Sequence, residues 1–226
     1  MEISIFDVTG PVMIGPSSSH TAGAARLGRA ARLIAGQPFH SVSFGLHGSF
    51  AQTYKGHGTD RALLAGVLGL SEQDERLAQA FGLAQAAGLQ YSFYPVQLDG
   101  VHENTVKITM DMDDGTQTTV VGSSIGGGQI CICEINGFEM EMNLRAPTLM
   151  FSHYDRKGVI SEVTRLIAEY DLNIATMKLS RKAKGDVACC VVEADGQIPE
   201  GLVAAIRGLH DILTAMSITL DEEEEA

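Results

Sequence analysis

The chain has 226 residues, of which 45% are hydrophobic and 19% are charged, so we expect a globular protein of one large or two modest domains. Its formal net charge of −12 disfavours a nucleic-acid partner, because an acidic surface repels phosphate backbones. No apolar run is long enough to span a membrane, and the first residues do not resemble a signal peptide. We therefore expect a cytoplasmic protein.

An α+β domain is predicted for residues 1–145, which are rich in Gly, Ser and His. Helical spacing of apolar residues and period-two alternation distinguish its helices from its strands. The predicted helices are residues 21–35, 60–70 and 72–87. The predicted strands are residues 6–9, 41–47, 91–96, 105–112, 116–121, 129–135 and 138–142.

The first unusual segment, residues 15–23, is predicted to be a loop directly before a helix. It contains Ser17, Ser18, Ser19 and His20. One of the serines could simply cap the helix. Several hydroxyl groups at a helix N-terminus also suit a carboxylate ligand, which makes this segment a candidate binding site.

The second segment, residues 48–62, is also predicted to be a loop. His57 lies between two glycines, and Lys55 precedes it by two residues. An imidazole can accept a proton near neutral pH, and a nearby ammonium group would help to keep it neutral. The alternative is an ordinary surface histidine. Thr59 or Asp60 is predicted to cap the helix that follows.

A third predicted loop, residues 122–128, has the sequence GSSIGGG. Its backbone amides could bind an anion, although it lacks the Gly-Lys-Ser/Thr ending of a phosphate-binding P-loop. The alternative is a flexible turn between two strands.

A second domain is predicted for residues 148–220, beginning just after Pro147, and residues 221–226 form an acidic tail. The predicted strands are residues 148–152, 174–180, 187–193 and 212–220, and the predicted helices are residues 159–170 and a segment opened by Pro199. This order is β-α-β-β-α-β, which is typical of a ferredoxin-like fold.

This second domain resembles the ACT domain, a regulatory module that pairs with other copies and often binds amino acids. Gly158, at the first strand-to-helix turn, and Asn173, after the first helix, carry the resemblance. It implies that Gly158 lets a regulatory ligand approach the helix N-terminus. Many ACT domains only dimerise, and Asn173 equally fits a turn residue.

The whole chain resembles the β-chain of the two-chain, iron–sulfur L-serine dehydratases. The matching segments are residues 6–11, GPSSSHTAGAARLG at 15–28, HGSFAQTYKGHGTDRALLAG at 47–66, GSSIGGGQI at 122–130 and EING at 134–137. The first domain is also similar to the substrate-binding domain inserted in some phosphoglycerate dehydrogenases, which performs no chemistry.

The resemblance implies a function: dehydration of L-serine to pyruvate and ammonia, with a [4Fe–4S] cluster and without pyridoxal phosphate. It implies that His57 is the base for the α-proton, or its orienting partner, and that Lys55 assists through its charge. Residues implied to bind substrate are Ser17, Ser18, Ser19, His20, Thr53 and Ser124. A non-catalytic serine-binding regulatory module is the alternative.

Four cysteines bear on where the cluster is held. Cys131 and Cys133 share a strand face and supply only two ligands, whereas Cys189 and Cys190 are adjacent in a predicted strand and point to opposite faces. We expect all four to be buried as small apolar residues, with no metal site in this chain. The resemblance places the cluster on a separate α-chain, and it implies further oligomerisation through the ACT domains.

Overall fold

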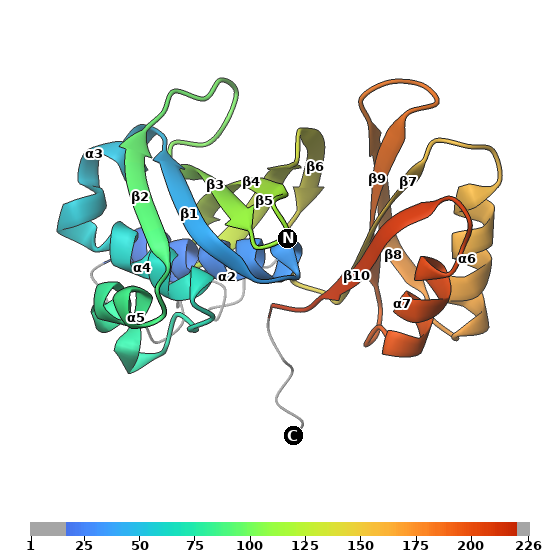
Figure 1. Ribbon diagram of the computed structural model, residues 1–226, viewed down its shortest axis with the longest axis horizontal. Helices are drawn as coiled ribbons and strands as arrows, with labels where there is room; N and C mark the ends of the chain where they lie inside the picture. The colour runs from blue at the N-terminus through green and yellow to red at the C-terminus, as the bar shows by residue number, and fades with distance from the viewer. Residues whose placement is uncertain (1–16, 221–226) are drawn as a thin grey trace, which may run out of the picture. The chain divides into compact units, whose positions relative to one another are not determined.

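A computed structural model describes residues 17–220 of the chain (Figure 1). The chain divides into two compact units, and the boundary between them in the sequence lies between Gly137 and Phe138. The predicted strand at residues 6–9, the first two residues of the serine-rich segment and the acidic tail at residues 221–226 lie outside the described residues. The predicted domain limits at residues 145 and 148 stay a prediction.

A mixed sheet has the strand order β2-β1-β3-β4-β5-β6; strands β1 to β5 belong to the first unit, and β6 begins at Phe138, just after the boundary. β1 runs parallel to β2, and the pairs β1–β3, β3–β4 and β4–β5 are antiparallel. The strands are β1 Phe39–Leu46, β2 Gln90–Pro95, β3 Thr105–Met112, β4 Gln117–Gly126, β5 Gln129–Ile135 and β6 Phe138–Met142. The prediction of an α+β unit is confirmed.

Side-chain alternation decides which face of this sheet is covered. Val106, Ile108 and Met110 of β3 are buried, whereas Lys107 and Thr109 between them are half-exposed. The buried face carries the helices of the unit (Figure 1). The core of the first unit therefore lies between one face of the sheet and these helices.

The helices of the first unit are α2 Ala24–Ala35, α3 Gly48–His57, α4 Thr59–Val67 and α5 Ala80–Ala86, with the short helices η1 Ser18–Gly23 and η2 Glu75–Gln79. α2 and α4 pack closely at two glycines. A Cβ on Gly28 would lie 2.3 Å from the carbonyl oxygen of Leu63, and one on Gly66 would lie 2.1 Å from that of Ala25.

Two segments predicted to be loops are helical. η1 is a π-helix that covers much of residues 15–23, and α3 covers most of residues 48–62. Gly58 has a φ of 71° and ends α3 directly before α4, so a single left-handed residue forms the whole connection. The two loop predictions are wrong because glycine and serine, which are typical of loops, here occupy caps and helix starts.

Three further corrections concern residue limits and caps. Residues 122–126 of the third predicted loop belong to β4, and the turn is confined to Gly127 and Gly128. The helix predicted at residues 72–87 is instead η2 followed by α5. No side chain caps α4, because Gly58 occupies its N-cap position.

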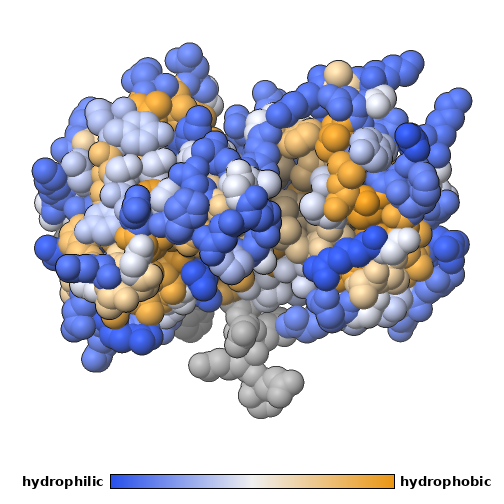
Figure 2. All heavy atoms as spheres, viewed as in Figure 1, coloured by the Kyte–Doolittle hydropathy of each residue, from blue (hydrophilic) through white to orange (hydrophobic). Residues whose placement is uncertain are grey.

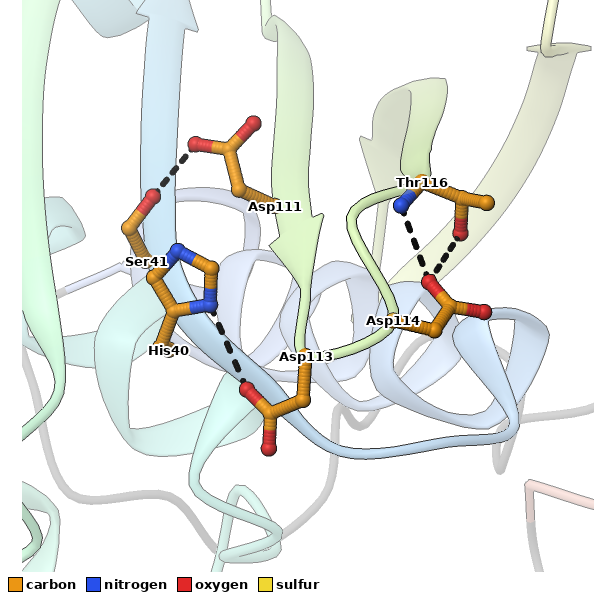
Figure 3. A network of polar contacts seen from close by, with 6 residues as sticks. All are labelled: His40, Ser41, Asp111, Asp113, Asp114 and Thr116. Atoms are coloured by element: carbon orange, nitrogen blue, oxygen red, sulfur yellow. Dashed lines mark hydrogen bonds and ion pairs between the residues drawn. The ribbon is translucent and has the colours of Figure 1, made fainter.

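A polar network fixes the β3–β4 turn of the first unit (Figure 3). The backbone N–H and the hydroxyl of Thr116 donate to Asp114 Oδ1 over 2.9 and 2.6 Å. Ser41 on β1 donates to Asp111 Oδ2 on β3 over 2.5 Å, and this bond, followed by one from Gln117, lowers the pKa of Asp111. These bonds hold the register at this end of the sheet.

From Thr148 onward, the second unit has the β-α-β-β-α-β order predicted from the sequence. Its elements are β7 Thr148–Tyr154, α6 Val159–Glu169, β8 Ile174–Arg181, β9 Val187–Ala194, α7 Glu200–Arg207 and β10 Ile212–Ile218. The antiparallel sheet has the order β10-β7-β9-β8. Phe151, Val163 and Val203 are fully buried between this sheet and the two helices.

Hydrophilic side chains are interspersed with hydrophobic ones on the face shown in Figure 2. Within residues 17–220, no helix combines the length and the apolar character needed to cross a membrane.

Candidate active site

Ser17 begins the site by capping η1. Its backbone is extended, with a φ of −146°, and its Oγ accepts the backbone N–H of His20 over 3.3 Å. The N–H of Thr21 donates to the carbonyl oxygen of Ser17 over 2.9 Å. This cap sets the first turn of η1 and so places the His20 side chain.

The His20 ring has a hydroxyl partner at each nitrogen. Ser17 Oγ lies 3.3 Å from Nδ1, and Ser49 Oγ, near the start of α3, lies 3.2 Å from Nε2. The ring of Phe50, which is fully buried, packs edge-on at 5.2 Å between centroids. Two hydrogen bonds and an aromatic wall therefore fix the orientation of this imidazole.

His57, the last residue of α3, lies beside His20. The two ring centroids are 4.8 Å apart and the planes are inclined by 35°. The Thr21 hydroxyl lies 3.5 Å from the carbonyl oxygen of His57, to which it donates. Burial lowers the pKa of His20, and repulsion from His57 lowers it further. This lowered pKa favours the neutral form of His20 near neutral pH.

Buried polar atoms without partners surround η1. His57 Nδ1 on α3, Thr59 Oγ1 on α4 and Ser124 Oγ on β4 make no hydrogen bond among the described residues. All three elements pack against η1. An unsatisfied buried polar atom costs roughly 1–3 kcal/mol. Such atoms point to a place where a polar ligand binds.

Ser124 is fully buried beside Gly23. A Cβ on Gly23 would lie 2.0 Å from Ser124 Oγ, so only glycine allows η1 to approach β4 this closely. Of the substrate residues implied by the resemblance, the structure thus places Ser17 and His20 at the start of η1 and Ser124 against its last residue, Gly23.

The remaining implied site residues lie in less direct positions. Ser18 and Ser19 are half-buried in the first turn of η1. The Thr53 hydroxyl donates to the carbonyl oxygen of Ser49 within α3 over 2.8 Å. Lys55 is exposed, with its Nζ 5.7 Å from the centroid of the Tyr54 ring. Because residues two apart on a helix do not face each other, Lys55 points away from His57, and its role stays a prediction.

Ser49 was not among the predicted site residues. It belongs to the HGSF segment that carries the family resemblance, but nothing in its local pattern connects it with a histidine 29 residues earlier. The contact exists only because α3 folds back against η1.

The two predicted regulatory residues lie at opposite ends of α6. Gly158 has a φ of 96°, precedes the helix and has open space around its Cα. Asn173 follows the helix, and its Nδ2 donates to Asp195 Oδ2 over 2.5 Å. Asn173 therefore ties the start of β8 to the turn after β9, and the ligand role of both residues stays a prediction.

The cysteines do not form a cluster site. Cys131 and Cys133 are half-buried on β5 in the first unit, so the prediction that all four are buried is wrong for this pair. Cys189 and Cys190 are buried on β9, and burial raises the pKa of their thiols to about 11 and about 12, which disfavours the thiolate that a metal needs. Within residues 17–220, no group of three or more potential ligands converges, so this part of the chain does not fit an iron–sulfur cluster.

Comparison with protein-family models matches residues 4–87 to the serine dehydratase beta chain and residues 148–211 to the ACT domain. An L-serine dehydratase, beta chain, of Peptoniphilus asaccharolyticus is 41% identical over 215 residues, which cover 95% of this chain and 97% of that protein. The chain belongs to the serine dehydratase beta chain family.

Two more distant relatives place this family member in context. An L-serine dehydratase of Escherichia coli (strain K12) is 30% identical over 168 residues, covering 64% of the family member and 37% of that longer protein. A D-3-phosphoglycerate dehydrogenase of Bacillus subtilis (strain 168) is 28% identical over 185 residues, covering 81% of the family member and 35% of the enzyme. The second match confirms the predicted likeness to that dehydrogenase.

Proposed function

We propose that this chain is the β-subunit of an L-serine dehydratase, which converts L-serine to pyruvate and ammonia. The observation that carries the proposal is the His20–His57 pair, set among serine hydroxyls at the start of η1. The rings lie 4.8 Å apart, and His57 Nδ1 is buried without a partner among the described residues. Loss of ammonia by this route begins with removal of the α-proton, a step that needs a base poised near neutral pH.

We assign the base to His57 and a positioning role to His20. His20 has hydroxyl partners at both nitrogens, so its ring atoms are already occupied. His57 Nδ1 has no partner in the described part of the chain. A proton on His57 meets little repulsion as long as His20 stays neutral, and the lowered pKa of His20 secures that condition.

The substrate carboxylate is assigned to the start of η1. Ser18 and Ser19 supply hydroxyl groups there, and Ser124, beside Gly23 at the other end of η1, has a buried hydroxyl without a partner among the described residues. Free N–H groups at a helix start and nearby hydroxyls favour an anion.

The proposed second subunit would supply the iron–sulfur cluster. The cysteines of this chain do not form a cluster site, so we assign a [4Fe–4S] cluster, and the Lewis-acid chemistry that it would supply, to a separate α-chain. The match to about a third of the longer Escherichia coli L-serine dehydratase supports a division of one enzyme into two chains. We also propose that the second units of two copies of this chain pair with each other and so form a larger oligomer.

The decisive experiment is reconstitution with the α-chain, iron and sulfide, followed by assay of serine-dependent pyruvate formation. The chain alone is expected to be inactive. His57→Asn should lower kcat by at least about 100-fold, as expected for loss of a general base, while subunit assembly measured by size exclusion stays intact. His210→Asn, a change at a histidine whose side chain is 90% exposed, is the matched control.

The second candidate is a serine-binding regulatory module without chemistry, which the match to a phosphoglycerate dehydrogenase favours. In that case His57→Asn would weaken serine binding and leave the turnover of any partner enzyme unchanged. Loss of turnover with serine binding intact would exclude the module.

A further inference from the structure

Ser49 has a fixed place in the site, although the sequence motifs did not single it out. Its backbone N–H donates to the carbonyl oxygen of Glu103 over 2.9 Å. A Cβ on the preceding Gly48 would lie 2.5 Å from the same oxygen, so this close approach requires glycine. The half-buried Ser49 side chain is thus anchored by the segment before β3 and held against His20.

The hydrogen bonds around His20 have a preferred direction. Ser17 Oγ accepts the backbone N–H of His20, and a hydroxyl that accepts one hydrogen bond becomes a stronger donor of its own proton. This favours Ser17 as the donor in its contact with His20 Nδ1, 3.3 Å away. A neutral imidazole with an accepting Nδ1 carries its proton on Nε2. That proton is then donated to Ser49 Oγ, 3.2 Å away.

Two further contacts favour a neutral His20. Its ring stands 4.8 Å from that of His57 and 5.2 Å from the buried ring of Phe50, so a charged form would face a second histidine and an apolar wall. Burial and the neighbouring His57 lower its pKa accordingly. The hydroxyl proton of Ser49 is the last donor in this series of hydrogen bonds, and it has no acceptor among the described residues.

We propose that Ser17, His20 and Ser49 form a directed chain of hydrogen bonds, and that the Ser49 hydroxyl at its end donates to an oxygen atom of the amino-acid substrate. The inference rests on the proposed function and names a further substrate-binding residue for it. Each acceptor in the chain polarises the next donor, so the Ser49 proton is a stronger donor than that of an isolated serine. The acceptor is a carboxylate or hydroxyl oxygen of the substrate.

The first test uses the reconstituted two-chain enzyme with Ser49→Ala. Loss of a hydrogen bond to a substrate oxygen is expected to lower kcat/KM for L-serine by about 10- to 100-fold. Ser49→Thr keeps a hydroxyl and is expected to retain most of the activity. Ser43→Ala, at a half-buried serine in the middle of β1, is the matched control and should match the unchanged enzyme.

Competition by L-alanine identifies the substrate oxygen, because alanine keeps the carboxylate and lacks the hydroxyl. If Ser49 binds the carboxylate, Ser49→Ala weakens alanine inhibition as much as serine binding. If it binds the hydroxyl, only serine is affected. An unchanged kcat/KM in Ser49→Ala, or equal losses in Ser49→Ala and Ser49→Thr, would overturn the proposal.

The second test measures the tautomer of His20 in the full chain alone, by nitrogen-15 NMR of the imidazole rings with His20→Gln for assignment. The proton is expected on Nε2 at pH 7.5, and Ser17→Ala should reduce that preference. A proton found mainly on Nδ1 of His20 would contradict the proposed direction of the hydrogen bonds from Ser17 through His20 to Ser49. This result does not depend on activity. Absence of serine turnover in the unchanged enzyme would refute the proposed function, whereas turnover that Ser49→Ala leaves intact would refute this inference alone.

Discussion

At the level of single residues, His20 connects the stability of the first unit with its proposed chemistry. Its ring joins the cap of η1 to the start of α3 through Ser17 and Ser49. The same burial that positions the ring lowers its pKa. A residue held neutral in the folded chain makes folding sensitive to pH, because the unfolded chain binds a proton that the folded chain resists.

We therefore predict that stability falls as the pH is lowered. Above the unfolded pKa of about 6.5, His20 is neutral in both states and its contribution is constant. As the pH falls from there toward the lower folded pKa, the unfolded chain is protonated first and stability decreases. Urea midpoints between pH 8 and pH 5 should decrease less in His20→Gln than in the unchanged chain. His210→Gln, at an exposed position, should follow the unchanged chain, and equal slopes for all three would contradict the assignment.

At the level of elements, the crossing of α2 and α4 supports the site. Gly28 and Gly66 allow backbone-to-backbone approach, and α2 continues directly from η1 while α4 follows directly from α3. The helices α2 and α4, which follow the segments that carry His20 and His57, are thus braced against each other. A change at their crossing should move both histidines.

We predict that Gly28→Ala destabilises the chain by about 1–3 kcal/mol, because its Cβ would meet the backbone of Leu63 and Val67. Gly82→Ala in α5 is the matched control, since nothing lies within 4 Å of its added Cβ, and alanine favours a helix by roughly 0.5–1 kcal/mol over glycine. Urea unfolding followed by circular dichroism measures both. Equal effects of the two substitutions would show that the crossing is loose.

At the level of the whole molecule, the two units have separate cores. The core of the second unit is built from β7, β9, β10, α6 and α7, with Leu149, Phe151 and Val192 almost fully buried. A unit with its own core can fold alone.

We predict that a fragment of residues 146–226 folds by itself, with a cooperative urea transition. Leu149→Ala in that fragment should cost about 2–5 kcal/mol, as expected for a large buried side chain. Circular dichroism as a function of urea measures both. A fragment without a cooperative transition would show that this core depends on the rest of the chain.

Local periodicity was sufficient to predict most of the elements. β3, β5 and β6 have the residue limits expected from alternation and from the Asn136-Gly137 turn, because a strand with one buried face shows its period in the sequence. The order of the second unit followed from the same patterns. Where glycine and serine are dense, in η1 and α3, composition predicted loops and the structure has helices, because caps and close packing use the same residues as loops.

The sequence alone determined the family, and it predicted which segments carry the chemistry, since the serine-rich segment and His57 lie in long family-specific motifs. Only the tertiary structure decided which side chains meet: His20 lies against His57, Ser49 contacts His20, and Lys55 lies over Tyr54. The physical reason is that such contacts join residues far apart in the chain: 37 positions separate His20 from His57, and Gly23 and Ser124 are farther apart still. They depend on how helices pack on a sheet, which no local pattern encodes.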